Sequence, residues 1–470
     1  MALLTIFLVL YVIIAISLIL GLLVNGVRPS KTLAWLLAIF TIPVGGILLY
    51  LLLGRNRRKN KILKKKDVSF KGASKTWGGI TQKDNLKHRR IINLVGKNCG
   101  FFPLEDNKAI LLKDGKTTFQ SIFNALENAK SYIYLQYYIF EEGDLADRLL
   151  QLFQSKVKQG LKVRMIYDSI GSYTLSKKYI KGLKSAGVEV FPFLPFRFDR
   201  FLSALNYRNH RKIIIVDGIH GFTGGINISD KYLKGDPDLG IWHDMHLQIT
   251  GPAVSQLEEV FLSDWFLVSE EQLQLNDVKE FNLADSEDFV PIQIVSSGPE
   301  DDFANIQQTY FSMITSAKKY LYITNPYVMP GPEILHALQT ASLSGVDVRL
   351  LVSERGDSTI VDWSIRSYFE PLLRAGVRLF LFPDGFLHSK IIVSDDSLAT
   401  VGTANIDMRS FEHNYEVNAL VYDEGFAEKL KRDFLKDCLN SIELDYDQFK
   451  QRTWITKLKE GTAKIFSPIL

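Results

Sequence analysis

Two segments of the chain each have a close counterpart nearly 190 residues later. AKSYIY at residues 129–134 returns as AKKYLY at 317–322, and GLKVRMI at 160–166 returns as GVDVRLL at 345–351. In each case an amphipathic helical pattern runs into a short, β-rich strand pattern. A repeat of this length is far longer than the units of solenoid proteins, so it predicts two similar domains.

Between the matched segments lie helical stretches, near residues 144–158 in the first copy and 333–344 in the second. Strands alternating with helices indicate an α/β fold in which helices flank a largely buried sheet. We expect the first half at 101–275 and the second at 276–452, with the boundary in the acidic stretch 267–288. With 470 residues, 46% of them hydrophobic, the chain can bury more than one core.

The N-terminus contains two uncharged apolar runs, at residues 3–24 and 33–53. Each is long enough to cross a bilayer as a helix, so residues 1–54 are predicted to form a transmembrane hairpin. Pro43, with glycines nearby, predicts a kink or close helix packing in the second run. Two buried helices of a soluble domain are the alternative.

A basic segment follows the second apolar run. Residues 55–66 hold eight Lys and Arg and no acid, within an expected linker of residues 55–100. By the positive-inside rule this places both hairpin ends in the cytoplasm, and the same charges can attract anionic lipid. The chain's net charge is +4, so the remaining residues sum to −4. A mildly acidic body argues against nucleic acid as a partner.

A third repeated element contains the polar residues. HRKIIIVD at 210–217 is followed six residues later by GGIN, and HSKIIVSD at 388–395 is followed six residues later by GTAN. Repetition at fixed spacing makes a chance match improbable. The polar residues shared by the two copies are His210, Lys212, Asp217 and Asn227 in the first, and His388, Lys390, Asp395 and Asn405 in the second.

The spacing within each copy suits an anion. A histidine and a lysine two positions apart on a strand point to the same face, so imidazole and ammonium can meet one phosphate. The glycines allow close approach of the backbone, and the asparagine amide donates hydrogen bonds. We group the six His, Lys and Asp residues as candidate catalytic residues. However, Asp217 and Asp395 have the opposite parity, which favours a structural role beside a buried polar or basic group.

A metal site is a weaker interpretation of the same histidines. Each has a lysine beside it on the same face, whose charge opposes a cation, and no carboxylate shares that face. The two cysteines, Cys99 and Cys438, form no zinc-binding cluster. We therefore expect neither a metal nor another cofactor.

These motifs resemble the phospholipase D superfamily, whose HxK(x)4D(x)6G(S/G/T)xxN pattern occurs twice. More narrowly, the chain resembles the bacterial cardiolipin synthases of the two-span kind, over essentially its full length. The further segments that are similar to this family are 32–37, 49–55, 242–246, Gly251 with Pro252, 297–299, 325–327, 405–410 and 414–416.

The resemblance implies a phosphatidyl-histidine mechanism. One imidazole attacks phosphorus while the other protonates the leaving alkoxide and later deprotonates the second alcohol. By family analogy His210 is the nucleophile and His388 the general acid and base, although the residues alone do not break this symmetry. The residues implied to stabilise the phosphoryl oxygens are Lys212, Lys390, Asn227 and Asn405.

The family pattern also implies a carboxylate that orients each histidine. Glu416, 28 residues after His388, matches the family position, and Asp244, 34 residues after His210, is its counterpart. Surface salt bridges are the alternative for both carboxylates. His243 should face away from Asp244 on a strand. One departure from the pattern is that the residue after the motif glycine is Gly225 in the first copy and Thr403 in the second.

The implied reaction joins two phosphatidylglycerol molecules into cardiolipin and glycerol, reversibly, at the bacterial cell membrane with the body on the cytoplasmic side. A membrane-bound phosphodiesterase that hydrolyses phospholipid is the first alternative, and an inactive membrane scaffold the second. Trp454, Leu458 and Ile465 align on one side of an amphipathic tail at 453–470, which predicts an interfacial helix or one docked on the body. Oligomeric state is not predicted.

Overall fold

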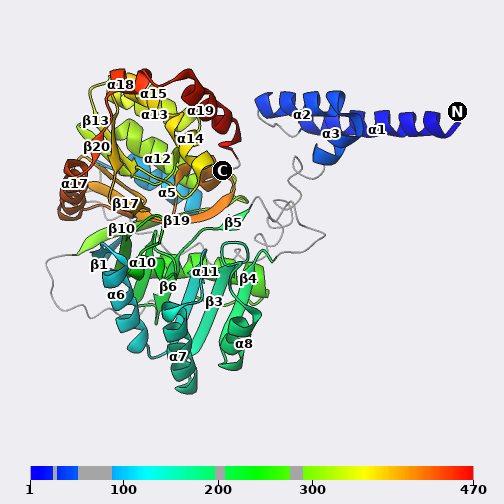
Figure 1. Ribbon diagram of the computed structural model, residues 1–470. Helices are drawn as coiled ribbons and strands as arrows, with labels where there is room; N and C mark the ends of the chain where they lie inside the picture. The colour runs from blue at the N-terminus through cyan, green and yellow to red at the C-terminus, as the bar shows by residue number, and fades with distance from the viewer. Residues whose placement is uncertain (1, 25–28, 51–86, 196–206, 276–288, 469–470) are drawn as a thin grey trace. The chain divides into compact units, whose positions relative to one another are not determined.

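The computed structural model describes residues 2–24, 29–50, 87–195, 207–275 and 289–468. They separate into two compact units, a helical N-terminal unit and the main body (Figure 1), and each is described by itself. The basic segment 55–66, the end of the second apolar run and most of the predicted boundary between the halves lie outside the described residues.

The N-terminal unit contains helices α1 (Ala2–Val24), α2 (Pro29–Thr41) and α3 (Pro43–Leu49). The second apolar run breaks between Thr41 and Pro43, because proline cannot donate a hydrogen bond within a helix. The Tyr11 hydroxyl donates to the carbonyl of Ile39 at 3.1 Å and ties α1 to α2. The predicted kink is therefore present. Within the described part of the chain, no helix meets the length and hydropathy required of a membrane span.

In the body, most of the described strands form one mixed sheet, whose two halves repeat the same strand order outward from a central β1–β10 pair, and two separate two-stranded sheets lie outside it. The strands of the first half, from centre to edge, are β1 (Leu104–Leu112), β9 (His246–Thr250), β7 (His220–Gly224), β6 (Ile213–Val216), β2 (Tyr132–Tyr137), β3 (Lys162–Asp168) and β4 (Glu189–Phe193). Their counterparts are β10 (Val290–Ser297), β19 (Asn414–Val421), β17 (Leu398–Gly402), β16 (Ile391–Ser394), β11 (Tyr320–Thr324), β13 (Asp347–Ser353) and β14 (Arg378–Phe382), with β20 (Ile442–Glu443) at the edge. The predicted duplication is thus present in the topology.

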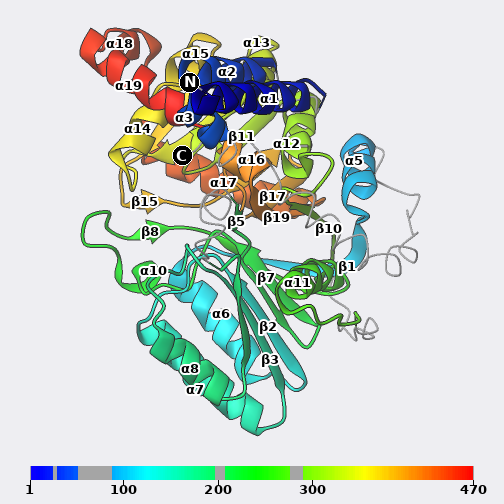
Figure 2. The same ribbon diagram turned by 90° about the vertical axis from the view of Figure 1, so that its right-hand side faces the viewer.

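Helices cover both faces of this sheet, as Figures 1 and 2 show. The helices of the first half are α6 (Gly115–Glu127), α7 (Asp144–Lys158), α8 (Lys177–Ser185), α10 (Lys231–Lys234) and α11 (Val254–Ser269). The helices of the second half are α12 (Asn305–Ser316), α13 (Pro332–Leu343), α14 (Thr359–Arg366), α15 (Phe369–Arg374), α16 (Met408–Glu412), α17 (Glu424–Leu439), α18 (Tyr446–Lys450) and α19 (Trp454–Phe466).

Alternate residues of each central strand enter different cores. Tyr132 and Tyr134 of β2 join one cluster shared by the two halves, whereas Ile133 joins the outer core of the first half. The ring of Tyr134 stacks on Phe261 of α11 with centroids 4.8 Å apart. The equivalent Tyr322–Phe434 stack in the second half has the same spacing, so the shared core is built on the repeat.

One segment differs from expectation. Part of the predicted 55–100 linker is helix α5 (Arg89–Cys99), whose residues Ile91, Ile92 and Val95 are buried in the core of the second half. Their i, i+1, i+4 spacing gives the helix an apolar face. This segment is therefore part of the second half's helical layer, although it precedes the first half in sequence.

Candidate active site

Both histidine–lysine motifs lie where a very short strand leads into a central strand. His210 and Lys212 lie between β5 (Arg208–Asn209) and β6, and His388 and Lys390 lie between β15 (Phe386–Leu387) and β16. All four side chains are buried. The prediction placed these residues on the strand itself. The structure places them just before it, and the apolar residues that follow anchor each motif in the core.

The first motif is fixed by the second half of the chain. Strand β5 pairs in parallel with β19, and the backbone N–H of His210 donates to the carbonyl of Tyr415 at 2.9 Å. This contact sets His210 beside the next residue, Glu416, whose Oε2 lies 3.0 Å from His210 Nδ1. Glu416 is completely buried, which excludes the alternative of a surface salt bridge for this residue.

The second motif repeats this arrangement with the roles of the two halves exchanged, because it is fixed by the first half of the chain. Strand β15 pairs in parallel with β8 (Trp242–His243), and the backbone N–H of His388 donates to the carbonyl of His243 at 2.8 Å. Asp244, also completely buried, places Oδ2 2.7 Å from His388 Nδ1. The spacing in the sequence relates each carboxylate to the histidine of its own copy. In the structure each half supplies the carboxylate for the histidine of the other.

The lysines give the site a positive charge that burial disfavours. Lys212 Nζ donates to the carbonyl of His210 at 2.8 Å, and Lys390 Nζ donates to that of His388 at 2.5 Å. Burial lowers the pKa of Lys212 to about 7 and that of Lys390 to about 8, and the charge of Lys390 further lowers the pKa of Lys212. A bound anion would offset both effects and raise these pKa values. The site is therefore suited to phosphate.

The histidines and carboxylates respond to the same environment. Burial and the nearby lysines hold the pKa of His210 and of His388 well below the usual range, which favours neutral imidazoles. Burial raises the pKa of Asp244 and of Glu416 to about 7 each, against the opposing charge of the lysines. Because each Nδ1 faces a carboxylate, Nε2 is the nitrogen available for chemistry.

Both motif asparagines are buried. Asn227 Oδ1 accepts from the backbone N–H of Ile139 at 3.2 Å, and its Nδ2 lies 3.4 Å from the Tyr232 hydroxyl. Asn405 is buried, and among the described residues its Oδ1 has no hydrogen-bond partner. Asn227 is thus linked to His388 through Tyr232, whose hydroxyl lies 3.3 Å from His388 Nδ1, and Asn405 stays a predicted phosphate ligand.

The motif aspartates are not at the site. Asp217 follows β6, at the opposite end from His210, and its carboxylate accepts from the backbone N–H groups of residues 130–132 at 2.7–2.9 Å. Asp395 does the same for residues 318–320 at 2.8–3.1 Å. Both adopt the left-handed conformation, with φ of 55° and 50°. Their grouping as catalytic residues is wrong. The structural role expected from parity is correct, but the partners are backbone amides at the start of β2 and β11, where a strand's free N–H groups need acceptors.

The two halves differ around the carboxylates. The Thr403 hydroxyl donates to Glu416 Oε2 at 2.5 Å, in line with the retained hydroxyl of the pattern. At the equivalent Gly225 a side chain would force the carboxylate of Asp244 to move, because its first carbon would overlap Oδ1 of that carboxylate. Asp244 accepts instead from the backbone N–H of Met245 at 2.8 Å. The glycine in the first copy is therefore required by the shorter carboxylate packed on it.

Gly225→Ala is expected to lower kcat by roughly 10²-fold, because the methyl group must displace Asp244 from His388, and a shift of about 1 Å can cost this much. The measurement is steady-state turnover, with Thr403→Ser as the matched control, since serine keeps the hydroxyl on Glu416. Unchanged kcat in Gly225→Ala would contradict the packing argument.

Aromatic rings surround the two histidines. The ring of Tyr138 meets His210 edge-on, with centroids 4.8 Å apart. The rings of Trp242 and Phe386 lie 5.4 and 5.7 Å from that of His388, with one ring from each half. These rings place apolar surface beside both imidazoles.

Tyr232 and Arg211 were not singled out from the sequence. The Tyr232 hydroxyl lies 3.3 Å from His388 Nδ1, five positions after Asn227. The equivalent position after Asn405 is Ser410, which contacts the backbone N–H of Asn405. An alignment of the two copies that extended beyond the motif would have placed Tyr232 opposite Ser410, and both residues are polar. Arg211, inside the first motif, has Ser389 as its counterpart, so the repeat gave no signal for it.

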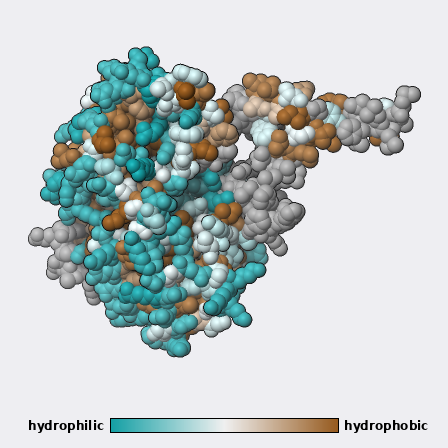
Figure 3. Space-filling view, in the orientation of Figure 1, coloured by the Kyte–Doolittle hydropathy of each residue, from teal (hydrophilic) through white to brown (hydrophobic). Residues whose placement is uncertain are grey.

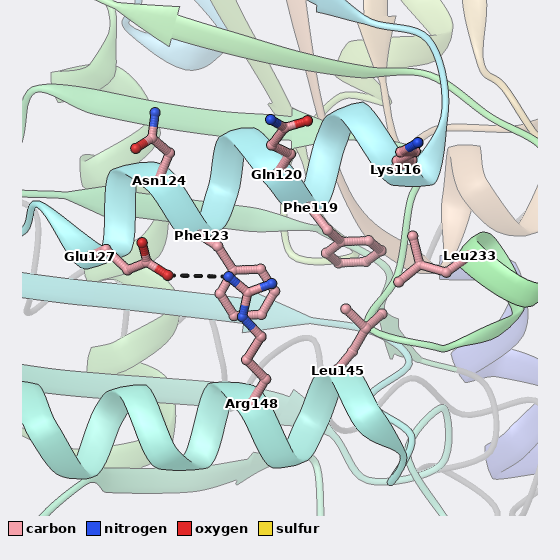
Figure 4. Close-up of a pocket in the computed structure, with 9 residues that line it drawn as sticks. All are labelled: Lys116, Phe119, Gln120, Phe123, Asn124, Glu127, Leu145, Arg148 and Leu233. Carbon is pink, nitrogen blue, oxygen red and sulfur yellow. Dashed lines mark hydrogen bonds and ion pairs between the residues drawn. The ribbon is translucent and has the colours of Figure 1, made fainter.

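Other candidate features do not join the site. His243 points away, as predicted: Nε2 lies 3.6 Å from Asp437, and the ring packs on Phe382. No group of three or more His, Cys, Asp or Glu among the described residues is arranged to hold a metal ion. A groove of about 480 Å³ between α6 and α7 (Figure 4) has an apolar floor that includes Phe119 and Phe123, and no motif residue lines it.

Comparison with known proteins agrees with the fold. The family model described as "Cardiolipin synthase, PLD-like domain" matches residues 122–265 and 310–438, and the model described as "Phospholipase_D-nuclease N-terminal" matches residues 9–55. A phosphatidylserine synthase structure from Haemophilus influenzae is similar in fold, with a TM-score of 0.60 and 14% identity. The match covers 81% of this chain and 99% of that one.

Two copies of one α/β half around a shared histidine–lysine site place the chain among the phospholipase D-like proteins. Cardiolipin synthase from Geobacillus kaustophilus is 41% identical over 94% of this chain and 89% of its own length. The major cardiolipin synthase ClsA of Bacillus subtilis is 37% identical over 94% of both. The chain belongs to the cardiolipin synthase family, and its enzymatic class is that of a phosphatidyltransferase.

Proposed function

We propose that the enzyme transfers the phosphatidyl group of one phosphatidylglycerol to a hydroxyl of another, giving cardiolipin and glycerol. The observation that carries this proposal is the pair of buried histidines, each held through Nδ1 by a carboxylate of the other half and each followed by a buried lysine. The names of the relatives, cardiolipin synthases, support the choice of lipid.

In the first step Nε2 of His210 attacks phosphorus of the donor lipid. The bond from phosphorus to the headgroup oxygen breaks, and His388 gives its proton to that oxygen, which releases glycerol. Lys212, Lys390, Asn227 and Asn405 stabilise the negative charge on the phosphoryl oxygens. Glu416 and Asp244 keep the two imidazoles in orientation.

In the second step His388, now neutral, takes the proton of a headgroup hydroxyl of a second phosphatidylglycerol. The oxygen attacks phosphorus, the phosphorus–nitrogen bond breaks, and His210 is restored. No atom or proton is gained or lost over the two steps, and because one phosphodiester of a primary alcohol replaces another, we expect the reaction to be reversible.

The bound substrate sets the required protonation. In the anion-free site both imidazoles have low pKa values, yet His388 must be protonated for the first step. A phosphodiester anion raises the pKa of nearby imidazoles and ammonium groups, and Asp244 favours the cation on His388. Substrate binding therefore supplies the proton arrangement that the first step needs.

We place the enzyme in the bacterial cell membrane, with its body on the cytoplasmic side. The uncharged runs at residues 3–24 and 33–53, the basic segment 55–66 and the family match at residues 9–55 support this topology. A membrane site concentrates lipid hydroxyls near the intermediate.

The aromatic rings of Tyr138, Trp242 and Phe386 favour transfer over hydrolysis, because they restrict water beside the histidines. The phosphodiesterase alternative differs only in that water attacks the intermediate. The products therefore distinguish the two functions.

Purified enzyme in phosphatidylglycerol vesicles is expected to form cardiolipin and glycerol in equal amounts, measured by lipid chromatography and a glycerol assay. His210→Ala and His388→Ala should abolish both products, and a chelator should leave the rate unchanged, since four donors already surround the anion. Phosphatidic acid as the main product would replace the proposal with a phospholipase D activity. Retained turnover in both histidine variants would refute the site.

A further inference from the structure

The C-terminal helix α19 is amphipathic in an unusual sense, because one face is docked and the opposite face is apolar and exposed. Its inner face packs on α14, where Glu460 and Ala463 are buried, and the Ser467 hydroxyl lies 3.0 Å from that of Tyr368, the residue before α15. Arg452, just before the helix, bonds both Glu460 and Glu370 at 2.8 Å. The helix is therefore held on the body in one rotational setting.

The outward face carries apolar side chains that the body does not cover. Trp454 is 72% exposed, Leu458 59% and Ile465 74%, and Ile455 and Phe466 extend the same face. At 3.6 residues per turn Trp454, Leu458 and Ile465 lie on the side of the helix opposite Glu460 and Ala463, and Ile455 and Phe466 lie on one flank of that stripe. In Figure 3 brown surface appears at the upper right of the body, where Figure 1 places α19.

Lysines border this face on both sides. Lys459 lies over the ring of Trp363 at 5.2 Å, and Lys464 lies over that of Tyr368 at 4.3 Å. Lys457 is also exposed, and Glu460, the one acid of the helix, is buried against Arg452. The exposed surface of α19 is thus an apolar stripe between cations, with no acidic group.

We infer that the outward face of α19 docks on an anionic lipid surface and holds the catalytic body against the membrane that contains its substrate. Apolar side chains enter the boundary between headgroups and acyl chains while flanking lysines reach the lipid phosphates. A second copy of this chain fits less well, because a twofold contact would bring lysine borders together. The inference rests on the proposed lipid substrate but concerns a surface separate from the active site.

The first test measures membrane depth and requires no turnover. Full-length Leu458→Cys and Ile465→Cys carry an environment-sensitive fluorophore in vesicles of phosphatidylcholine with or without phosphatidylglycerol. Leu439→Cys at the end of α17, where Leu439 is 87% exposed, is the matched control. Labels on α19 should be quenched by lipids brominated in the acyl chain, more strongly with phosphatidylglycerol, and the control label should not. A water-exposed label at 458, or equal quenching at 439, would overturn the inference.

The second test uses activity. The double variant Leu458→Glu/Ile465→Glu should lower kcat/KM on phosphatidylglycerol vesicles at least ~10-fold, because the two introduced carboxylates are repelled by the anionic surface. The kcat on a soluble short-chain phosphatidylglycerol should stay unchanged. Leu439→Glu should change neither. Equal loss on both substrates would refute surface docking, and spontaneous 458–458 disulfide formation between Leu458→Cys chains would assign the face to a second copy. If the wild-type enzyme makes no cardiolipin yet the α19 labels are embedded, the proposed function fails and the docking inference stands.

Discussion

His388→Asn is expected to yield an enzyme that cleaves an activated phosphatidyl donor once and then stops. With a p-nitrophenyl headgroup the leaving group needs no proton, so His210 can still form the phosphatidyl-histidine bond. The second alcohol then lacks its base, and the intermediate persists. The expected result is a burst of about one nitrophenol per site, with steady-state turnover lowered roughly 10³-fold. His210→Asn should give no burst, because the nucleophile is absent.

Stopped-flow absorbance measures the burst, and mass spectrometry of the quenched protein locates the adduct. Phosphatidylglycerol itself is the matched control, because its glycerol alkoxide requires the acid and should give no burst with His388→Asn. A burst in His210→Asn together with none in His388→Asn would exchange the two roles. This experiment resolves the symmetry that the paired motifs leave open.

Arg211→Met is expected to lower the free energy of unfolding by about 3–5 kcal/mol, the usual result of removing one member of a buried ion pair. The buried guanidinium of Arg211 donates to Asp264 Oδ2 at 2.7 Å and to the carbonyls of Ser297 and Glu416 at 3.1 and 3.2 Å. It therefore joins the first half to two neighbouring strands of the second. Methionine would leave the Asp264 carboxylate buried without its cation.

Urea unfolding of the full chain in detergent measures this loss as a shift of the midpoint at constant slope. Lys113→Met is the matched control. Lys113 pairs with Asp433 across the same two halves, but at an exposed position, and its removal should cost less than ~1 kcal/mol. Adding Asp264→Asn to Arg211→Met should recover part of the loss, because no buried charge then remains unpaired. An equal shift in Lys113→Met would show that burial is not the cause.

Activity should also fall in Arg211→Met, because the same side chain holds the backbone of Glu416, which orients His210. A purely structural role would leave the kcat of the folded fraction unchanged. A positioning role predicts reduced kcat even after correction for the folded fraction.

The duplicated topology could be predicted because it depends on patterns that repeat along the chain. The matched segments 129–134 and 317–322 contain the beginnings of β2 and β11 and the residues just before them. The helix predicted at 144–158 is α7, which has the same limits. The parity of Asp217 and Asp395 correctly separated them from the histidines. Local pattern determines local structure and the direction of side chains on a strand.

The exchange of carboxylates could not be predicted, because it depends on how β5 and β8 pair with strands of the other half. These strands are two residues long and carry no periodic signal. The role of Tyr232 depends in the same way on a contact over 156 residues, with His388. Spacing identified the residues of the site but not their partners.

The crossed histidine–carboxylate pairs make each half incomplete alone, since His210 without Glu416 and His388 without Asp244 would lose their orientation. A symmetric dimer of one such half would also contain two complete histidine–carboxylate pairs. However, the two subunits would have the same sequence, so the residues around the two histidines would have to be identical. Joining the copies in one polypeptide removes that constraint and lets each position change separately. Gly225 and Thr403, Tyr232 and Ser410, and Arg211 and Ser389 are such divergences. Covalent fusion thus allows two equivalent imidazoles to become chemically distinct, as a reaction with one nucleophile and one proton carrier requires.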